Sequence, residues 1–192
     1  YFMIVIGNGE SRKNLDISKI KDYKIGCNAV YRDFSIDELV CVDRRMVKEA
    51  IDQGFTKSIY TRLDWMAQFS RNKNVKVVPH LPYKGTLRMD NPFQWGSGPY
   101  AILLATRYSK RIKIIGFDLY SENKNVNNIY KDTIHYDKSS KHAVDPSYWI
   151  HQIAKVIEAF PKKRFEIYQK EGWSLPESWR LKNVSVDIID NL

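Results

Sequence analysis

The sequence predicts an α/β fold built on a mainly parallel sheet with helices on both faces. Apolar runs such as residues 3–6, without a polar residue, and 112–115, interrupted only by Lys113, are typical of strands that are covered on both sides. Segments of helical spacing separate these runs, and strands that alternate with helices favour a parallel sheet. The chain has 192 residues and 43% hydrophobic content, which suits a single domain over 1–192.

The predicted elements follow one another along the whole chain. The segments with the character of strands are 3–6, 24–27, 39–42, 58–60, 76–78, 112–115, 164–167 and 184–189. The segments predicted as helices are 44–53, 62–69, 98–108 and 148–160. In the predicted helix 44–53, Met46, Val47 and Ala50 lie on one side, and Gly54 ends the helix. Residues 121–147 are long and polar, which in a compact domain is typical of a lid.

Charge and cysteine content limit the class of protein. The net charge of +9 fits either a solvated surface or attraction to an anionic partner such as a nucleotide, an acidic glycan or nucleic acid, and both interpretations stay open. Cys27 and Cys41 lie in apolar runs, so we expect buried thiols and a reducing, cytoplasmic setting. No run approaches the ~20 apolar residues of a membrane span.

Polar motifs follow the first three predicted strands. Gly7-Asn8-Gly9 follows the first strand, Asn28 the second and Asp43 the third. Ligands of open parallel sheets collect beyond the carboxyl ends of the strands, so we expect these residues to meet at one site. Glycines let backbone N–H groups approach a phosphate, and Asn8 can donate its amide. Each motif also has a structural interpretation: tight turns for the first two and a helix N-cap for Asp43.

The segment WGSGPYA, residues 95–101, places a Gly-Ser-Gly turn before a predicted helix. Free N–H groups at a helix start attract anions, so Ser97 and Gly98 are candidate ligand contacts. A serine nucleophile is not indicated, because Ser97 lacks the G-x-S-x-G spacing and no strand directly precedes it. The four histidines show no paired ligand spacing, so the sequence predicts no metal site.

Four motifs in order resemble the bacterial sialyltransferases of glycosyltransferase family 42. They are IVIGNGES, CNAVY, GSGPYAILLA and IKIIGFDLY, and the resemblance covers residues 3–160. Members of that family have a strand with G-N-G-P-S, a C-N-x-x-Y, an S-G before a helix and a strand that ends in G-x-D-x-Y. The resemblance implies one Rossmann-like nucleotide-binding domain, a CMP-sugar as donor substrate, no other cofactor and no metal.

The resemblance also implies roles for individual residues. Those that would hold the cytidine nucleotide are Asn8, Asn28, Ser97 and Gly98, next to Gly9. Tyr120 and Tyr130 would contact the leaving phosphate, whose growing negative charge needs hydrogen-bond donors when no metal is present. The family base is a histidine between the lid and the next helix, and His142 holds that place here. An imidazole suits removal of a proton near neutral pH, and His80 is the rival candidate.

Two positions depart from the family pattern. Glu10 stands where the family has proline, and Asp43 stands where it has asparagine. A carboxylate repels phosphate or sialate, so we expect Asp43 to bind sugar or ribose hydroxyls instead. The departure leaves the identity of the donor sugar open.

The resemblance therefore implies a metal-independent inverting glycosyltransferase. It would move a sugar from a CMP-sugar to a hydroxyl of a glycan or of another acceptor, such as a hydroxylated DNA base. One alternative is a pyrophosphokinase-like enzyme, because pterin pyrophosphokinase-like and flagellin-glycosylation proteins share this fold and its G-N-G and G-x-D motifs. Another is a non-catalytic nucleotide- or glycan-binding module. The sequence leaves oligomer formation open.

Overall fold

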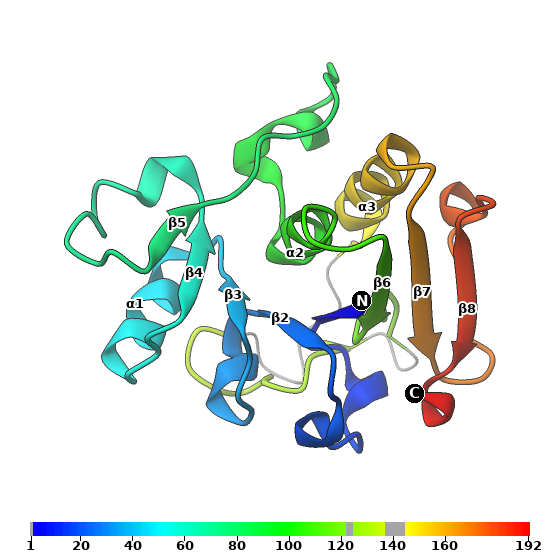
Figure 1. The fold of residues 1–192 in the computed structure, drawn as a ribbon, viewed down its shortest axis with the longest axis horizontal. Coiled ribbons are helices and arrows are strands. Elements are labelled where there is room, and N and C mark those ends of the chain that lie inside the picture. The colour runs from blue at the N-terminus through cyan, green and yellow to red at the C-terminus, as the bar shows by residue number, and fades with distance from the viewer. Residues whose placement is uncertain (1, 122–124, 137–144) are drawn as a thin grey trace.

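The chain forms one eight-stranded sheet in which all neighbouring strands are parallel (Figure 1). The computed structural model describes residues 2–121, 125–136 and 145–192. The strands are β1 (Phe2–Ile6), β2 (Tyr23–Cys27), β3 (Glu38–Val40), β4 (Ser58–Thr61), β5 (Val75–Val77), β6 (Arg111–Ile115), β7 (Arg164–Gln169) and β8 (Val184–Ile188). The predicted α/β class and parallel sheet are confirmed.

The strand order places β1 and β6 side by side in the interior of the sheet, as predicted. The order is β5-β4-β3-β2-β1-β6-β7-β8, so the chain winds outward from β1 in one direction and then, from β6, in the other. Strand β1 is fully buried, since Met3, Ile4, Val5 and Ile6 are each 0% exposed. This is expected of a strand in a sheet that is covered on both faces. The reversal between β1 and β6 is where open parallel sheets place their ligands.

The described residues contain three α-helices, α1 (Arg44–Asp52), α2 (Ser97–Ala105) and α3 (Ser147–Ala159). Helix α1 begins at its N-cap Asp43, and the chain leaves it through Gly54 at φ +86°. Helix α2 is buried over nearly its whole length and lies beside α3 on one face of the sheet (Figure 1). None of these helices is long and apolar enough to cross a membrane, within the residues described.

The side chains of the sheet divide between two apolar cores. Met3 and Val5 point into a core that they share with α2 and α3. Ile4 and Ile6 point to the opposite side, where Met46 of α1 and short 3₁₀ turns pack. This alternation is the period-2 geometry of a strand, and both cores need β1 to be apolar throughout. Cys27 and Cys41 are buried free thiols, as predicted.

Two predicted elements differ from the structure. Residues 62–69 do not form an α-helix: a 3₁₀ turn, Leu63–Trp65, continues in turns with i→i+3 hydrogen bonds. A segment this short has too few bonds to stabilise a helix by itself. Strand β3 ends at Val40 rather than residue 42, because the Val42 N–H donates to the hydroxyl of Ser97 instead of joining the sheet (3.0 Å).

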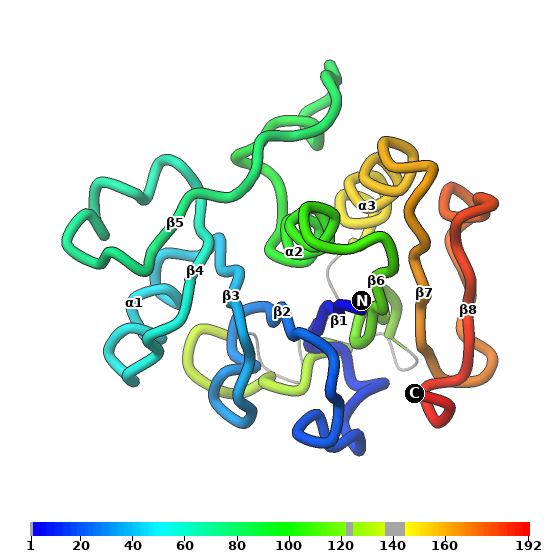
Figure 2. The backbone as a smooth tube through the Cα atoms, in the orientation of Figure 1, coloured from blue at the N-terminus to red at the C-terminus, as the bar shows by residue number. Residues whose placement is uncertain are grey.

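The described part of the predicted lid, 125–136, lies against the body of the protein. Figure 2 shows it beside the turn that follows β2. The Ile129 N–H donates to the carbonyl of Asn8 (2.8 Å), and Lys131 pairs with Glu10 (2.6 Å). These contacts place residues 125–136 next to the carboxyl end of β1.

Candidate functional site

A cavity of about 410 Å³ opens beside the reversal point of the sheet. The turns after β1, β2, β3 and β6, the start of α2, part of α3 and parts of 126–136 line it. The volume lies within the ~300–1,000 Å³ typical of small-molecule sites. The sequence-predicted residues that line it are Asn8, Gly9, Asn28, Asp43, Ser97 and Gly98.

Gly7 and Gly9 pack the turn after β1 against the turn after β6. A Cβ at Gly9 would lie 2.4 Å from Cγ of Asp118, which is closer than side chains tolerate. The Gly7 N–H donates to the carbonyl of Ile115 and the Gly9 N–H to that of Gly116, each at 2.8 Å. These two N–H groups therefore serve the fold and are not available to the phosphate for which the sequence analysis proposed them.

The side chain of Asn8 joins β1 to β2. Its Nδ2 donates to the carbonyl of Cys27, and its Oδ1 accepts from Nη2 of Arg12, both at 2.9 Å. Arg12 also donates from Nε to the carbonyl of Gly7 (2.6 Å) and is 2% exposed. No carboxylate pairs with Arg12 among the described residues, so it adds a buried positive charge next to the cavity wall. Sequence analysis gave Arg12 no role, because only tertiary packing determines its burial.

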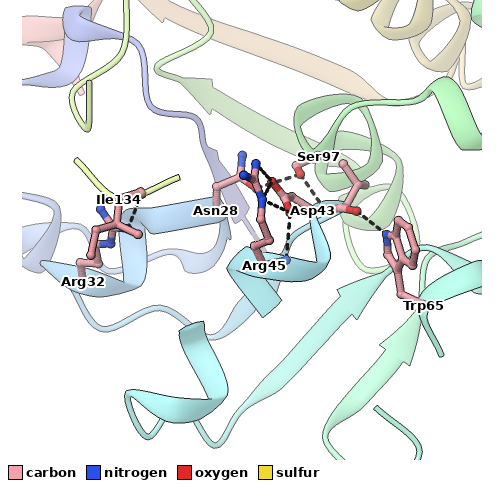
Figure 3. A network of polar contacts seen from close by, with 8 residues as sticks. Asn28, Arg32, Asp43, Arg45, Trp65, Ser97 and Ile134 are labelled. Atoms are coloured by element: carbon pink, nitrogen blue, oxygen red, sulfur yellow. Dashed lines mark hydrogen bonds and ion pairs between the residues drawn. The ribbon is translucent and has the colours of Figure 1, made fainter. Parts of the chain in front are cut away.

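A chain of hydrogen bonds joins Asn28 to Trp65 along one wall (Figure 3). The hydroxyl of Ser97 donates to Oδ1 of Asn28 (2.9 Å) and accepts from the N–H of Val42 (3.0 Å). The Val42 carbonyl accepts from Nε1 of Trp65 (2.7 Å). Because Oδ1 of Asn28 is occupied, its NH₂ group is the part of that side chain suited to donate to a ligand.

Helix α2 directs its first backbone N–H groups toward this wall. Ser97 and Gly98 are its first two residues, and no side chain caps the helix at Gly96. Their N–H groups have no partner inside the helix, and both residues line the cavity. The partial positive charge of the helix start favours an anion at this position.

Asp43 is the N-cap of α1, which is the structural alternative that the sequence analysis left open. Its Oδ1 accepts from the N–H of Arg45 (2.9 Å) as the N-cap of α1, and its Oδ2 pairs with Nη2 of Arg45 at 2.7 Å (Figure 3). Burial raises the pKa of Asp43, but the hydrogen bonds and charge of Arg45, with His135 nearby, lower it overall. Asp43 still lines the cavity, next to His135.

The tyrosine that lines the cavity is not one of the two that the sequence analysis named. Tyr120 is 40% exposed and Tyr130 donates to Asp33 (2.8 Å), and neither lines the cavity. Burial and the Asp33 carboxylate raise the pKa of Tyr130 to about 12. Tyr136 does line the cavity, and its hydroxyl accepts from the N–H of Ala29 (3.1 Å). Tyr136 therefore joins the candidates for a ligand contact on the basis of its position.

One described histidine lines the cavity. It is His135, whereas His80 is exposed outside the lining and His151 is paired with Asp90 at 2.7 Å. His142, the base candidate of the sequence analysis, lies outside the described residues. His135 therefore joins the base candidates on the basis of its position.

Asp118 from the G-x-D-x-Y motif serves the fold beside the cavity. It accepts from the N–H of Ser11 (2.9 Å), the hydroxyl of Ser11 (2.5 Å) and Nε2 of Gln169 (2.9 Å). Asp118 is 7% exposed, so these bonds take most of its capacity to accept hydrogen bonds. The acid of the motif thus fixes the turn after β6 against the turn after β1.

Backbone strain gathers around the cavity. Three lining residues other than glycine have positive φ: Asn28 (53°), Leu119 (66°) and His135 (69°). Asn and His enter this region at moderate cost, whereas a leucine rarely does. Strained residues concentrate at ligand sites, so their position here favours a functional cavity.

No group of three His, Cys, Asp or Glu side chains suited to a metal ion occurs in the described ranges. No model of a known protein family matches the chain, and neither the curated proteins nor the solved structures that were searched contain a significant match.

Proposed function

We propose that the protein is a glycosyltransferase that uses a CMP-sugar donor without a metal ion. The observation that carries the proposal is the cavity, whose lining includes residues from all four motifs of the sialyltransferase resemblance. Gly9 and Asn28 come from the first two motifs, Ser97 from the third and Asp118 from the fourth. Residues far apart in the sequence thus contribute to one pocket of suitable size.

The donor phosphate would lie at the start of α2. The N–H groups of Ser97 and Gly98, which have no partner inside the helix, would attract an anion there, and the buried charge of Arg12 adds to the local positive potential. The NH₂ group of Asn28 would donate to the nucleotide. The hydroxyl of Tyr136 would donate to the departing phosphate, since it already accepts from the N–H of Ala29.

The proposed reaction is an inverting displacement. The acceptor hydroxyl oxygen attacks the anomeric carbon, the bond from that carbon to the phosphate oxygen breaks, and CMP leaves from the opposite face. The hydroxyl proton passes to a histidine base, for which His135 has the position within the described residues. Donors near the phosphate stabilise the charge that grows on it. Residues 121–147 would close over the donor as a lid.

A thermal-shift panel with CMP, UDP, GDP and ATP, with and without a chelator, tests the proposal. We expect CMP to raise the melting temperature most, and the chelator to leave that shift unchanged. Preference for ATP with Mg²⁺ would favour the pyrophosphokinase-like alternative instead. CMP binding with no transfer to any acceptor would favour a binding module.

A further inference from the structure

A partly exposed cluster of arginine and aromatic side chains lies next to the cavity wall. We call Arg44, Arg62, Trp65 and Phe93 the arginine–aromatic surface. The guanidinium of Arg62 lies 4.9 Å from the ring centre of Trp65 and 5.2 Å from that of Phe93, so one cation contacts two rings. The guanidinium of Arg44 lies 5.5 Å from the ring centre of Trp65.

Arg44 and Phe93 of this surface are open to solvent, whereas Arg62 and Trp65 are half-buried against the fold. Phe93 is 45% exposed, a high fraction for a phenylalanine. The turn that carries it is held by Tyr100, whose hydroxyl donates to the carbonyl of Pro92 (2.9 Å). Trp65 is held by its bond to Val42, a cavity-lining residue (Figure 3). The surface thus presents planar groups in fixed positions immediately outside the site.

The charges of this surface favour an anionic occupant. Asp64 pairs with Arg62 (2.6 Å), but within the described chain Arg44 makes no ion pair and is exposed. The protein as a whole carries +9. Nucleic acid strands combine phosphates, which pair with arginines, with bases, which stack on rings and guanidinium planes. A sugar ring of an anionic polysaccharide can also pack on an aromatic ring, but it has no flat π-face to stack on a guanidinium plane, whereas a nucleobase does.

We propose that the arginine–aromatic surface binds single-stranded nucleic acid and directs one nucleotide toward the cavity. Binding by itself does not depend on the glycosyltransferase assignment. The further step, that this strand carries the acceptor hydroxyl, rests on the proposed function. The two statements therefore need separate measurements.

Fluorescence anisotropy with a labelled oligothymidylate, without donor present, tests the binding. We expect Phe93→Ala to weaken binding about tenfold or more through lost stacking, and Phe93→Leu to restore little of it. Arg44→Ala should reduce the slope of log affinity against log salt by about 0.7, the share of one phosphate contact. Circular dichroism would verify that each variant is folded.

Arg111→Ala is the control for net charge, although Arg111, unlike Arg44, pairs with Glu166. Arg111 also lies over a ring, that of Phe2 at 4.2 Å, but at the opposite ends of β1 and β6 from the cavity. This variant loses the same charge, and we expect unchanged oligonucleotide binding. Equal weakening by Arg111→Ala and Arg44→Ala would overturn the proposal, because binding would then reflect net charge alone.

Two further outcomes separate this inference from the proposed function. Binding of an anionic polysaccharide that is tighter than oligothymidylate binding would also overturn the proposal. If CMP fails to shift the melting temperature while Phe93-dependent oligonucleotide binding persists, the glycosyltransferase proposal fails and this surface assignment stands.

Discussion

Arg32 and Glu49 form a two-pronged ion pair that holds residues 129–136 in place. Nη2 of Arg32 lies 2.6 Å from Oε1 of Glu49, and Nε donates to Oε2 at 3.1 Å. The same guanidinium donates to the hydroxyl of Thr133 (2.8 Å) and to the carbonyl of Ile134 (3.1 Å, Figure 3). Planar bidentate recognition of this kind is specific to arginine.

Replacing Arg32 should therefore loosen this segment. We expect Arg32→Ala to speed backbone hydrogen exchange at 129–136 and to weaken CMP binding, because His135 and Tyr136 of the cavity wall belong to that segment. Arg111→Ala breaks a similar two-pronged pair with Glu166 far from the cavity and should change neither measurement. Equal exchange rates in wild type and Arg32→Ala would contradict the anchoring role.

The proton-accepting histidine can be identified from pH profiles. We expect His135→Ala to lower the transfer rate by about 10²–10⁴-fold and to remove the acidic limb of the profile, while CMP affinity stays nearly unchanged. His80→Ala, outside the cavity lining, should retain the wild-type rate. Loss of transfer in His142→Ala with full activity in His135→Ala would return the base role to His142.

Gly9 should not tolerate a side chain. Its φ of −64° suits any residue, but an added Cβ would meet the carboxylate of Asp118. We expect Gly9→Ala to lower the free energy of unfolding by about 1–3 kcal/mol and to reduce CMP binding as the cavity wall shifts. Gly172→Ala is the contrast, since Gly172 has open space but φ +83°. It should cost about 1 kcal/mol and leave CMP binding intact, as urea titration and thermal shift would show.

Glu38 should make stability depend on pH. Burial raises its pKa, the hydroxyls of Tyr108 and Tyr60 offset this in part, and its Oε2 has no partner within the described residues. A carboxyl whose folded pKa is raised stabilises the fold most below its unfolded pKa, and that contribution is lost as pH rises through the folded value.

We therefore expect Glu38→Gln to gain stability relative to wild type as pH rises from 4 toward 7, by about 1 kcal/mol or more at neutral pH. Urea unfolding at several pH values would measure the difference. Glu171→Gln, at an exposed position, should track the wild type throughout. A neutral-pH loss of stability in Glu38→Gln would mean that the ionised form is favoured.

The sequence predicted best those features that depend on periodic patterns. The apolar runs of β1 and β6 identified interior strands, and the positions of Asn28 and Ser97 after strand and turn identified cavity residues. The choice between Tyr130 and Tyr136 could not be predicted, since both lie in an irregular segment without periodicity. The side chain of Tyr130 points to Asp33, and that of Tyr136 points to the N–H of Ala29. Both partners are distant in the sequence.

The contact between Gly7 and Gly116 has a consequence for recognising relatives. A Cβ on Gly7 would lie 2.6 Å from the carbonyl oxygen of Gly116, and one on Gly116, at φ +74°, would lie 2.3 Å from that of Gly7. Each added side chain would meet the backbone of the other residue, so both positions should stay glycine in any chain with this reversal point. Paired glycines more than a hundred residues apart, each ending an apolar strand, form a search pattern that survives when overall similarity has been lost.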